Sequence, residues 1–294
     1  MPRLDRLATL YFFSPLSHLV GRKLAACVPV LMYHSVSDNL FGKSHPYFQI
    51  NTLPLTFANQ MRWLQRNGYT TIGLNEMLLA LGSGQPLEKR FVLTFNRGYQ
   101  DFYTEAFPVL RQFAFDATVY LTTDCIQNSS MRMEGADYLT WSQVRELSKE
   151  GVKFGSHTAT NADLSSLDLE QIDYELGYSK EILEDKLGTA VDTFSYPLAF
   201  PEEDRTFARF LADILENHGF ENGVSTIIGR ASANSNRFYL PRLPINSWDD
   251  PPLLRAKLSG GYDWLHGPQW FNKFVHHNIS LMERSSLLQT NRFE

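Results

Sequence analysis

The sequence contains few cysteines and no apolar run long enough to cross a membrane. Its 294 residues include two cysteines, Cys27 and Cys125. Two cysteines do not make a disulfide framework and favour a reducing compartment. The apolar N-terminal stretch, residues 7–20, is interrupted by Pro15 and is too short to span a bilayer. These absences exclude a disulfide-stapled secreted domain and favour a globular protein.

The sequence also lacks basic runs, internal repeats and low-complexity tracts. Its net charge is -5, and 20% of its residues are charged. With no basic patch, we expect no nucleic-acid partner. Hydrophobic residues make up 43% of the chain, which is enough apolar mass for a large core. The length allows two domains, but α/β barrels often use this length for one.

The N-terminal segment, residues 1–26, is predicted to be a helical extension of a barrel domain over residues 27–294. Its stretch 7–20 is typical of an amphipathic helix that packs on the domain or touches a membrane surface. Residues 24–27, LAAC, are similar to a lipoprotein cleavage box, but basic residues precede it where an apolar segment would be needed. We expect a cytoplasmic protein, with a position peripheral to the membrane as the alternative.

Short apolar strands alternate with amphipathic helices along most of the chain. The expected strands cover residues 28–38, 91–95, 116–123, 152–158, 192–200, 223–230 and 238–245. The expected helices cover residues 54–69, 103–113, 140–151, 168–188 and 205–220, with Thr140 as an N-cap. This alternation predicts an α/β fold with a parallel sheet. With this number of strands, a distorted and closed or nearly closed (β/α) barrel of about seven strands is expected.

The stretch RFVLTFNRGYQDFYTEAF, residues 90–107, has the form of a site without the usual reactive groups. An apolar strand over residues 91–95 ends in a turn that contains Asn96 and Arg97. In β/α barrels, active-site residues lie at the C-terminal ends of the strands. An amide and a guanidinium cannot act as a general base, and neither is a usual metal ligand.

Several strand ends resemble those of the polysaccharide deacetylase family, the NodB-type carbohydrate esterases of family four. The resemblance covers about residues 28–250. It is carried by VPVLMYHSVSD at 28–38, TFNRGYQD at 94–101, GSHTATN at 155–161, FSYPLAF at 194–200 and LPRLPI at 240–245. The family's fold agrees with the barrel expected from the alternation of strands and helices.

The resemblance implies metal-assisted removal of an N-acetyl group from a sugar polymer. In the family, one aspartate acts as the base, while a second aspartate and two histidines hold a divalent metal such as zinc. Carried over by position, the base corresponds to Asn96 and the metal-binding aspartate to Arg97. The two histidines correspond to His157 and Asn161. The late strand supplies Arg242 at the border of the site, and Leu198 stands where the third motif usually has its second aromatic residue.

These residues do not support the family's chemistry. A catalytic zinc needs about three protein ligands, and only His157 remains. Arg97 adds a permanent positive charge that repels a dication, and Asn96 cannot accept a proton. We therefore predict no bound metal cofactor and a catalytically inactive protein that binds carbohydrate or has a regulatory role. The alternative is an active hydrolase with a relocated metal site formed by His34, Asp38 and His157.

The expected partner is a polysaccharide or oligosaccharide, and the sequence leaves the oligomeric state open. The candidate binding residues are Asn96, Arg97, His157, Asn161, Tyr196, Pro197 and Arg242. Arg97 either holds an anionic sugar group, pairs internally with Asp101, or has no role. His157 is favoured as a hydrogen-bonded structural histidine. Tyr196, Pro197 and Trp248 either stack against sugar rings or pack in the core and at its rim.

Overall fold

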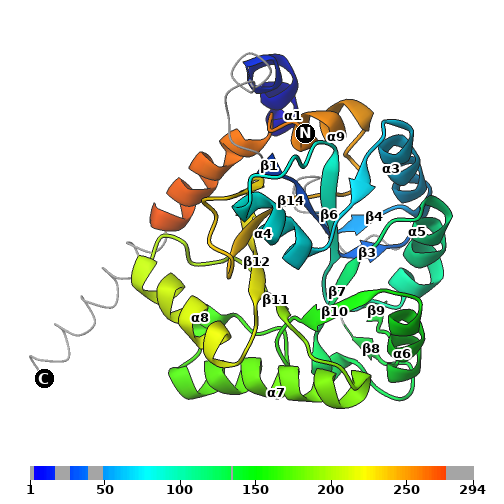
Figure 1. Cartoon of the computed structure of the whole chain (residues 1–294), viewed down its shortest axis with the longest axis vertical. Coiled ribbons are helices and arrows are strands. Elements are labelled where there is room, and N and C mark those ends of the chain that lie inside the picture. The colour runs from blue at the N-terminus through cyan, green and yellow to red at the C-terminus, as the bar shows by residue number, and fades with distance from the viewer. Residues whose placement is uncertain (1–2, 17–26, 39–48, 134, 276–294) are drawn as a thin grey trace, which may run out of the picture.

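The structure is a computed structural model, and it describes residues 3–16, 27–38, 49–133 and 135–275. Within these residues, strands and helices alternate as the sequence predicts (Figure 1). Five outer helices match expected segments: α3 (Pro54–Arg66), α5 (Phe107–Phe113), α6 (Trp141–Lys149), α7 (Leu169–Leu187) and α8 (Arg205–Asn217). Helix α9 (Pro251–Leu258) follows the last barrel strand and lies outside those segments. Helix α5 continues a π-helical turn, η3 (Phe102–Ala106).

Seven parallel strands close into a barrel. They are β2 (Val30–Tyr33), β6 (Arg90–Phe95), β7 (Thr118–Leu121), β10 (Lys153–Ser156), β11 (Thr193–Ser195), β12 (Asn222–Ile228) and β14 (Leu240–Pro244). The strand order is β2-β14-β12-β11-β10-β7-β6, and a further pairing of β2 with β6 closes the ring. The expected α/β class and the barrel of about seven strands are therefore confirmed.

The remaining strands are short and lie outside this ring. Strand β5 (Thr70–Thr71) pairs with β6 at the N-terminal end of β6. The other pairs are β1 (Cys27–Val28) with β13 (Ala231–Ser232), β3 (Ser35–Val36) with β4 (Asn51–Thr52), and β8 (Arg132–Met133) with β9 (Ala136–Asp137).

Two long helices begin at capping boxes that the sequence encodes. The Thr140 hydroxyl accepts from the Gln143 backbone, and the Gln143 side chain accepts from the Thr140 backbone. Asp168 and Gln171 make the same reciprocal pair at the start of α7. Each box satisfies two backbone N–H groups that the first helical turn leaves without partners. The expected N-cap at Thr140 is confirmed.

Side chains along each strand alternate between the helices and the barrel interior. In β6, the odd-numbered residues from Phe91 to Phe95 belong to the large core beneath the outer helices. Val92, between them, belongs to a smaller core that also contains Met77 of helix α4 (Leu74–Gly82). Because β6 has period two, Thr94 and Asn96 face the interior with Val92. Helix α4 lies across the barrel where the strands begin (Figure 1), so the opposite end is left for a site.

The described part of the N-terminal segment is helical. Helix α1 (Leu4–Ala8) continues as η1 (Thr9–Phe13) and packs beside α9 (Figure 1). Arg6 pairs with Asp250 at 2.6 Å, and the Phe13 ring stacks on Trp264 with centroids 4.6 Å apart. Residues 1–2 and 17–26 of the predicted extension lie outside the described residues. In the described part of the chain, no helix is both long and apolar enough to cross a bilayer.

Candidate functional site

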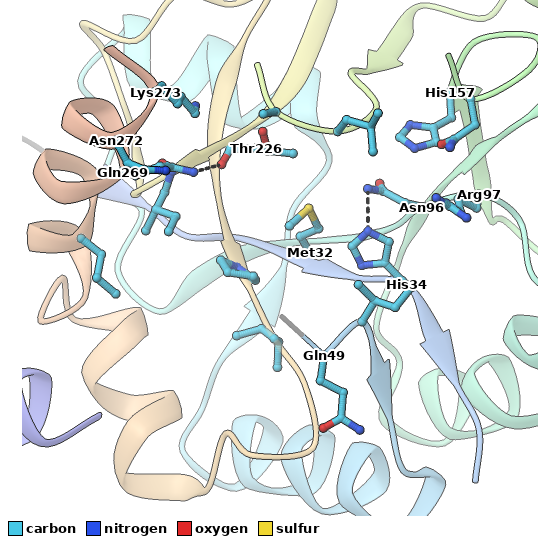
Figure 2. Close-up of a pocket in the computed structure, with 18 of the residues that line it drawn as sticks. Met32, His34, Gln49, Asn96, Arg97, His157, Thr226, Gln269, Asn272 and Lys273 are labelled. Carbon is cyan, nitrogen blue, oxygen red and sulfur yellow. Dashed lines mark hydrogen bonds between the residues drawn. The ribbon is translucent and has the colours of Figure 1, made fainter. Parts of the chain in front are cut away.

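A cavity of about 630 Å³ lies at the C-terminal ends of the barrel strands. One end is polar and is formed by His34, Asn96, Arg97, His157 and Asn161, at the ends of β2, β6 and β10. Figure 2 shows four of these side chains grouped on one side of the cavity. The sequence predicted Asn96, Arg97, His157 and Asn161 as a group, and the structure brings them together.

Asn96 lies at the centre of this polar end and is 2% exposed. Its Oδ1 accepts from Nη1 of Arg242 at 2.8 Å and from Oγ of Ser195 at 3.3 Å. Since a guanidinium only donates, this contact fixes which side of the amide carries the oxygen. The amide nitrogen lies 3.4 Å from Nε2 of His34, the contact drawn in Figure 2. The side chain is therefore held as an acceptor for Arg242, in a geometry that an aspartate could also adopt.

Arg242, the arginine of the late strand, is completely buried behind Asn96. Its other bonds go to the Ser225 carbonyl at 2.8 Å, to Oγ of Ser195 at 3.1 Å and to Oγ1 of Thr94 at 3.4 Å. All these acceptors are neutral, and within the described residues no carboxylate forms an ion pair with this guanidinium. Burial lowers the pKa of Arg242 to about 10, which leaves it charged at neutral pH. The interior end of the site thus carries a buried positive charge that no described carboxylate balances.

Both histidines of the site are held neutral. Burial, with added repulsion from Arg242 and Arg97, lowers the pKa of His34 to about 3. The same causes lower the pKa of His157 well below its usual value. Nδ1 of His157 lies 2.8 Å from the Ser195 carbonyl, and because a carbonyl only accepts, Nδ1 carries the proton. Nε2 of His157 is then a hydrogen-bond acceptor.

The turns around the cavity have unusual backbone conformations. Arg97, Thr158, Asn161 and Leu198 all have positive φ, between 51° and 74°. This region is uncommon for residues other than glycine and is an outlier for a β-branched residue such as Thr158. Such conformations cluster at functional sites, where the surrounding structure must hold them. The cluster supports a binding role for this end of the barrel.

The turn from Thr158 to Asn161 is held by a buried carboxylate. Glu175 on α7 accepts from the backbone N–H groups of Ala159 and Thr160 at 2.9 and 3.0 Å. It also accepts from the Thr160 hydroxyl at 2.7 Å. The Asn161 backbone in turn donates to the Thr158 hydroxyl at 2.9 Å. These bonds keep His157 and Asn161 at the cavity although the backbone at Thr158 and Asn161 has positive φ.

Arg97 does line the cavity, and one of its bonds goes to a neighbouring hydroxyl. Its Nη1 donates to Oη of Tyr99 at 3.1 Å. Asp101, the internal partner that the sequence suggested, is bonded instead by the Ser35 hydroxyl and the Val36 backbone. Burial raises the pKa of Asp101 to about 6. Asp101 lines a separate hollow, so its carboxylate is not part of the cavity.

The aromatic residues proposed for sugar stacking occupy other places. Tyr196 is 2% exposed, and its ring packs edge-on against Phe194 and Phe200. Pro197 is also buried, and neither residue is among those that line the cavity. Trp248 is half exposed and is not itself among the described lining residues, although it donates to Gln49, which is. The placement of Tyr196 and Pro197 corrects their assignment as sugar contacts, because alternation along β11 directs Tyr196 into the core with Phe194.

A relocated metal site at His34, Asp38 and His157 is not formed. The two histidines share the cavity, but Asp38 lines the separate hollow that contains Asp101. No three histidine, cysteine or acidic side chains come together as a possible metal site anywhere in the described residues. A divalent metal does not fit the polar end of the cavity. The side chains that could bind it there are two neutral imidazoles and two amides, and the fixed positive charges of Arg97 and Arg242 lie beside them.

The opposite wall of the cavity comes from a helix over residues 266–275 that the sequence did not link to the site. Gln269 joins this helix to β12, accepting from the Ile228 backbone at 2.9 Å and donating to the Thr226 carbonyl at 2.8 Å (Figure 2). Lys273 donates to the Phe200 carbonyl and to Glu202, both at 2.9 Å. Glu202 also lies 2.7 Å from Nε2 of His266, and both of these residues line a separate hollow. Nothing in the spacing of these residues indicates that they meet the strand ends.

Comparisons with known proteins agree with this fold. A family model described as polysaccharide deacetylase matches residues 83–221. The Bacillus subtilis protein YxkH, whose name assigns it to the polysaccharide deacetylases, is 30% identical over 238 residues, which are 81% of this chain and 76% of that protein. The poly-beta-1,6-N-acetyl-D-glucosamine N-deacetylase of Escherichia coli K12 is 33% identical over 138 residues, which are 44% of this chain and 20% of that protein.

Solved structures of deacetylases have the same fold. The deacetylase PplD of Streptococcus pyogenes, in complex with acetate, superposes with a TM-score of 0.66 at 25% identity and covers 80% of this chain and 99% of that chain. The polysaccharide deacetylase BC0361 of Bacillus cereus gives a TM-score of 0.65 at 25% identity, over 80% of this chain and 69% of that chain. The barrel therefore has the fold of the polysaccharide deacetylases. The chain belongs to the polysaccharide deacetylase family.

Proposed function

We propose that this chain is a catalytically silent member of its family that binds a carbohydrate in the cavity at the strand ends. The observation that carries the proposal is the bond from Arg242 to Asn96 at 2.8 Å. At the position where the resemblance expects the base, the chain has a neutral amide that cannot accept a proton. The scaffold around that position is intact, so the cavity can still bind while the reaction is lost.

The charges of the site support the same conclusion. Arg97 stands where the resemblance expects a metal-binding aspartate, and Arg242 lies behind it with its own positive charge. Two guanidinium groups near one point repel a divalent cation, and little solvent screens them there. Without a metal, nothing lowers the pKa of a water molecule toward about 7. The proposal places this binding function in the cytoplasm, as the low cysteine content suggests.

The test measures acetate release and binding on the same N-acetylglucosamine oligosaccharides. The protein is incubated with β-1,6-linked oligomers, with and without added zinc, and acetate is assayed over a long time course. We expect no acetate above the buffer blank, and binding by calorimetry that a chelator leaves unchanged. Zinc-dependent acetate release that a chelator abolishes would instead establish an active hydrolase.

A further inference from the structure

The cavity has two chemically different parts. The polar end contains Arg97, Asn161 and the neutral imidazole of His157. The rest of the wall is mainly apolar and includes Met32, Ile228, Ile245, Leu198 and Leu265. Figure 2 shows Met32 between the strand-end group and the helix that carries Gln269. A ligand that fills the whole cavity must therefore carry a polar head and an apolar body.

The apolar part is unlike a surface that binds an extended sugar chain. Nine side chains of the described lining are apolar, and none of the described lining residues is phenylalanine, tyrosine or tryptophan. A sugar ring usually stacks on such an aromatic face, and the described part of the lining offers none. A volume of about 630 Å³ is in the range of pockets that enclose a small molecule. An alkyl or acyl chain suits these aliphatic walls better than a row of hydroxyl groups does.

The polar end favours a negative charge. No described residue that lines the cavity is an aspartate or glutamate, whereas Arg97 lines it directly. Arg242 lies one side chain deeper, with neutral acceptors as its described partners. A carboxylate at the polar end would be attracted by both guanidinium groups at short range, where little solvent screens them. Nε2 of His157 remains as an acceptor for a sugar hydroxyl.

We propose that the cavity binds an acidic sugar that carries an apolar chain. The acid group lies at Arg97 and Asn161, a hydroxyl of the sugar donates to His157, and the chain lies along Met32, Ile228 and Leu265. This inference rests on the proposed binding function and names its ligand class. A glycolipid and an acylated saccharide share this chemistry, and the cavity accommodates the region where head and chain join.

Calorimetry with three probes, each below its critical micelle concentration, separates the two parts of the ligand. Dodecyl β-D-glucuronide has both the acid and the chain, dodecyl β-D-glucoside lacks the acid, and sodium glucuronate lacks the chain. We expect the dodecyl glucuronide to bind at least about tenfold more tightly than either of the others, since each missing part removes a buried contact. Equal affinity for the glucuronide and the glucoside would overturn the acidic head, and equal affinity for the glucuronide and glucuronate would overturn the apolar chain.

Two variants assign the contacts, and both suit the local backbone. Arg97→Asn removes the charge at φ 74°, and Leu198→Asn removes an apolar wall at φ 51°, where asparagine is better tolerated than most residues. Arg97→Asn should abolish the preference for glucuronide over glucoside. Leu198→Asn should reduce the preference for dodecyl glucuronide over glucuronate. Unchanged preferences in both correctly folded variants would place the ligand elsewhere.

Lys89→Asn is the matched control. Lys89 is an exposed cation with φ 55°, and it precedes β6, at the end of the strand opposite Arg97. The Lys89→Asn variant should bind all three probes with unchanged affinity. An acetyl-glucosamine oligomer serves as a fourth probe: binding of this oligomer without any preference for dodecyl glucuronide would overturn the ligand class and leave the proposed function standing. Acetate release would overturn the proposed function itself.

Discussion

At the scale of single residues, the pairing of Asn96 with Arg242 defines the site. Because the Arg242 side chain is completely buried, the folded protein bears the cost of removing its guanidinium from water. Its partners are amide, hydroxyl and carbonyl oxygens, which stabilise a charge less than a carboxylate does. Among the residues that the structure describes, the buried arginine therefore has neutral partners and no carboxylate.

Replacing Asn96 with aspartate should stabilise the protein. Asn96→Asp keeps the shape and adds a charge 2.8 Å from Nη1 of Arg242, so we expect the free energy of unfolding at pH 7 to rise by about 1–3 kcal/mol. Arg242 lowers the pKa of the new carboxyl, so the gain is present above the unfolded pKa of about 3.9 and is lost as the pH falls through the folded pKa. Urea titrations at several pH values measure this change in the free energy of unfolding. The control is Asn161→Asp, which adds a carboxylate at the same cavity but outside the Arg242 contacts. If Asn96→Asp does not raise the free energy of unfolding, the pairing of Asn96 with Arg242 is contradicted.

The neutral histidines should make the protein sensitive to acid. The pKa of His157 is lowered, so below about pH 6.5 the unfolded chain binds a proton that the folded chain does not. The free energy of unfolding should then fall as the pH falls, by up to about 1.4 kcal/mol per pH unit from this one group. His157→Gln should make that decline between pH 6 and pH 4 shallower when measured by denaturant titration.

His266 provides a control of opposite sign. A hydrogen bond to Glu202 raises the pKa of His266, so its contribution is present at low pH and is lost as the pH rises. His266→Gln should therefore steepen the decline on acidification. If His157→Gln steepens the decline as well, His157 is not held neutral in the folded protein.

At the scale of elements, the strand ends were predictable and the far wall was not. Period-two alternation along β6 and β11 directs Asn96 and Ser195 inward and Tyr196 toward the helices, which is why Tyr196 packs in the core. The positions of Asn96, Arg97, His157 and Asn161 follow from motifs at the ends of parallel strands. The wall formed by residues 266–275 depends on the packing of a late helix against β12, which no local pattern specifies.

The contacts of Gln269 should hold that wall in place. Gln269→Ala removes the partners of the Ile228 N–H and the Thr226 carbonyl, and leaving buried backbone groups unsatisfied costs about 1–3 kcal/mol. We expect faster amide exchange at Ile228 and earlier proteolysis within residues 266–275. Gln127→Ala removes one exposed bond to the Asp124 carbonyl and is the control. Equal protection of Ile228 in both variants would show that the helix does not depend on Gln269.

At the scale of the whole molecule, the fold agrees with the family, and the proposal of a silent site rests on the residues at the strand ends. The closed seven-stranded barrel was predictable from the alternation of strands and helices. The bond from Arg242 to Asn96 was not, because it joins side chains 146 positions apart whose approach depends on barrel closure. The binding function proposed here combines this family fold with the amide and guanidinium groups found at the strand ends.

The most direct test of this account is the zinc content of the purified chain after incubation with zinc and gel filtration. The triple variant Asn96→Asp, Arg97→Asp, Asn161→His, which restores the ligand set and the base that the family resemblance implies, is measured beside it by elemental analysis. We predict almost no zinc in the natural chain and about one zinc per chain in the variant, since a carboxylate and a second imidazole complete the three protein ligands that zinc needs. One tightly held zinc in the natural chain would contradict the account and return metal-dependent hydrolysis to first place.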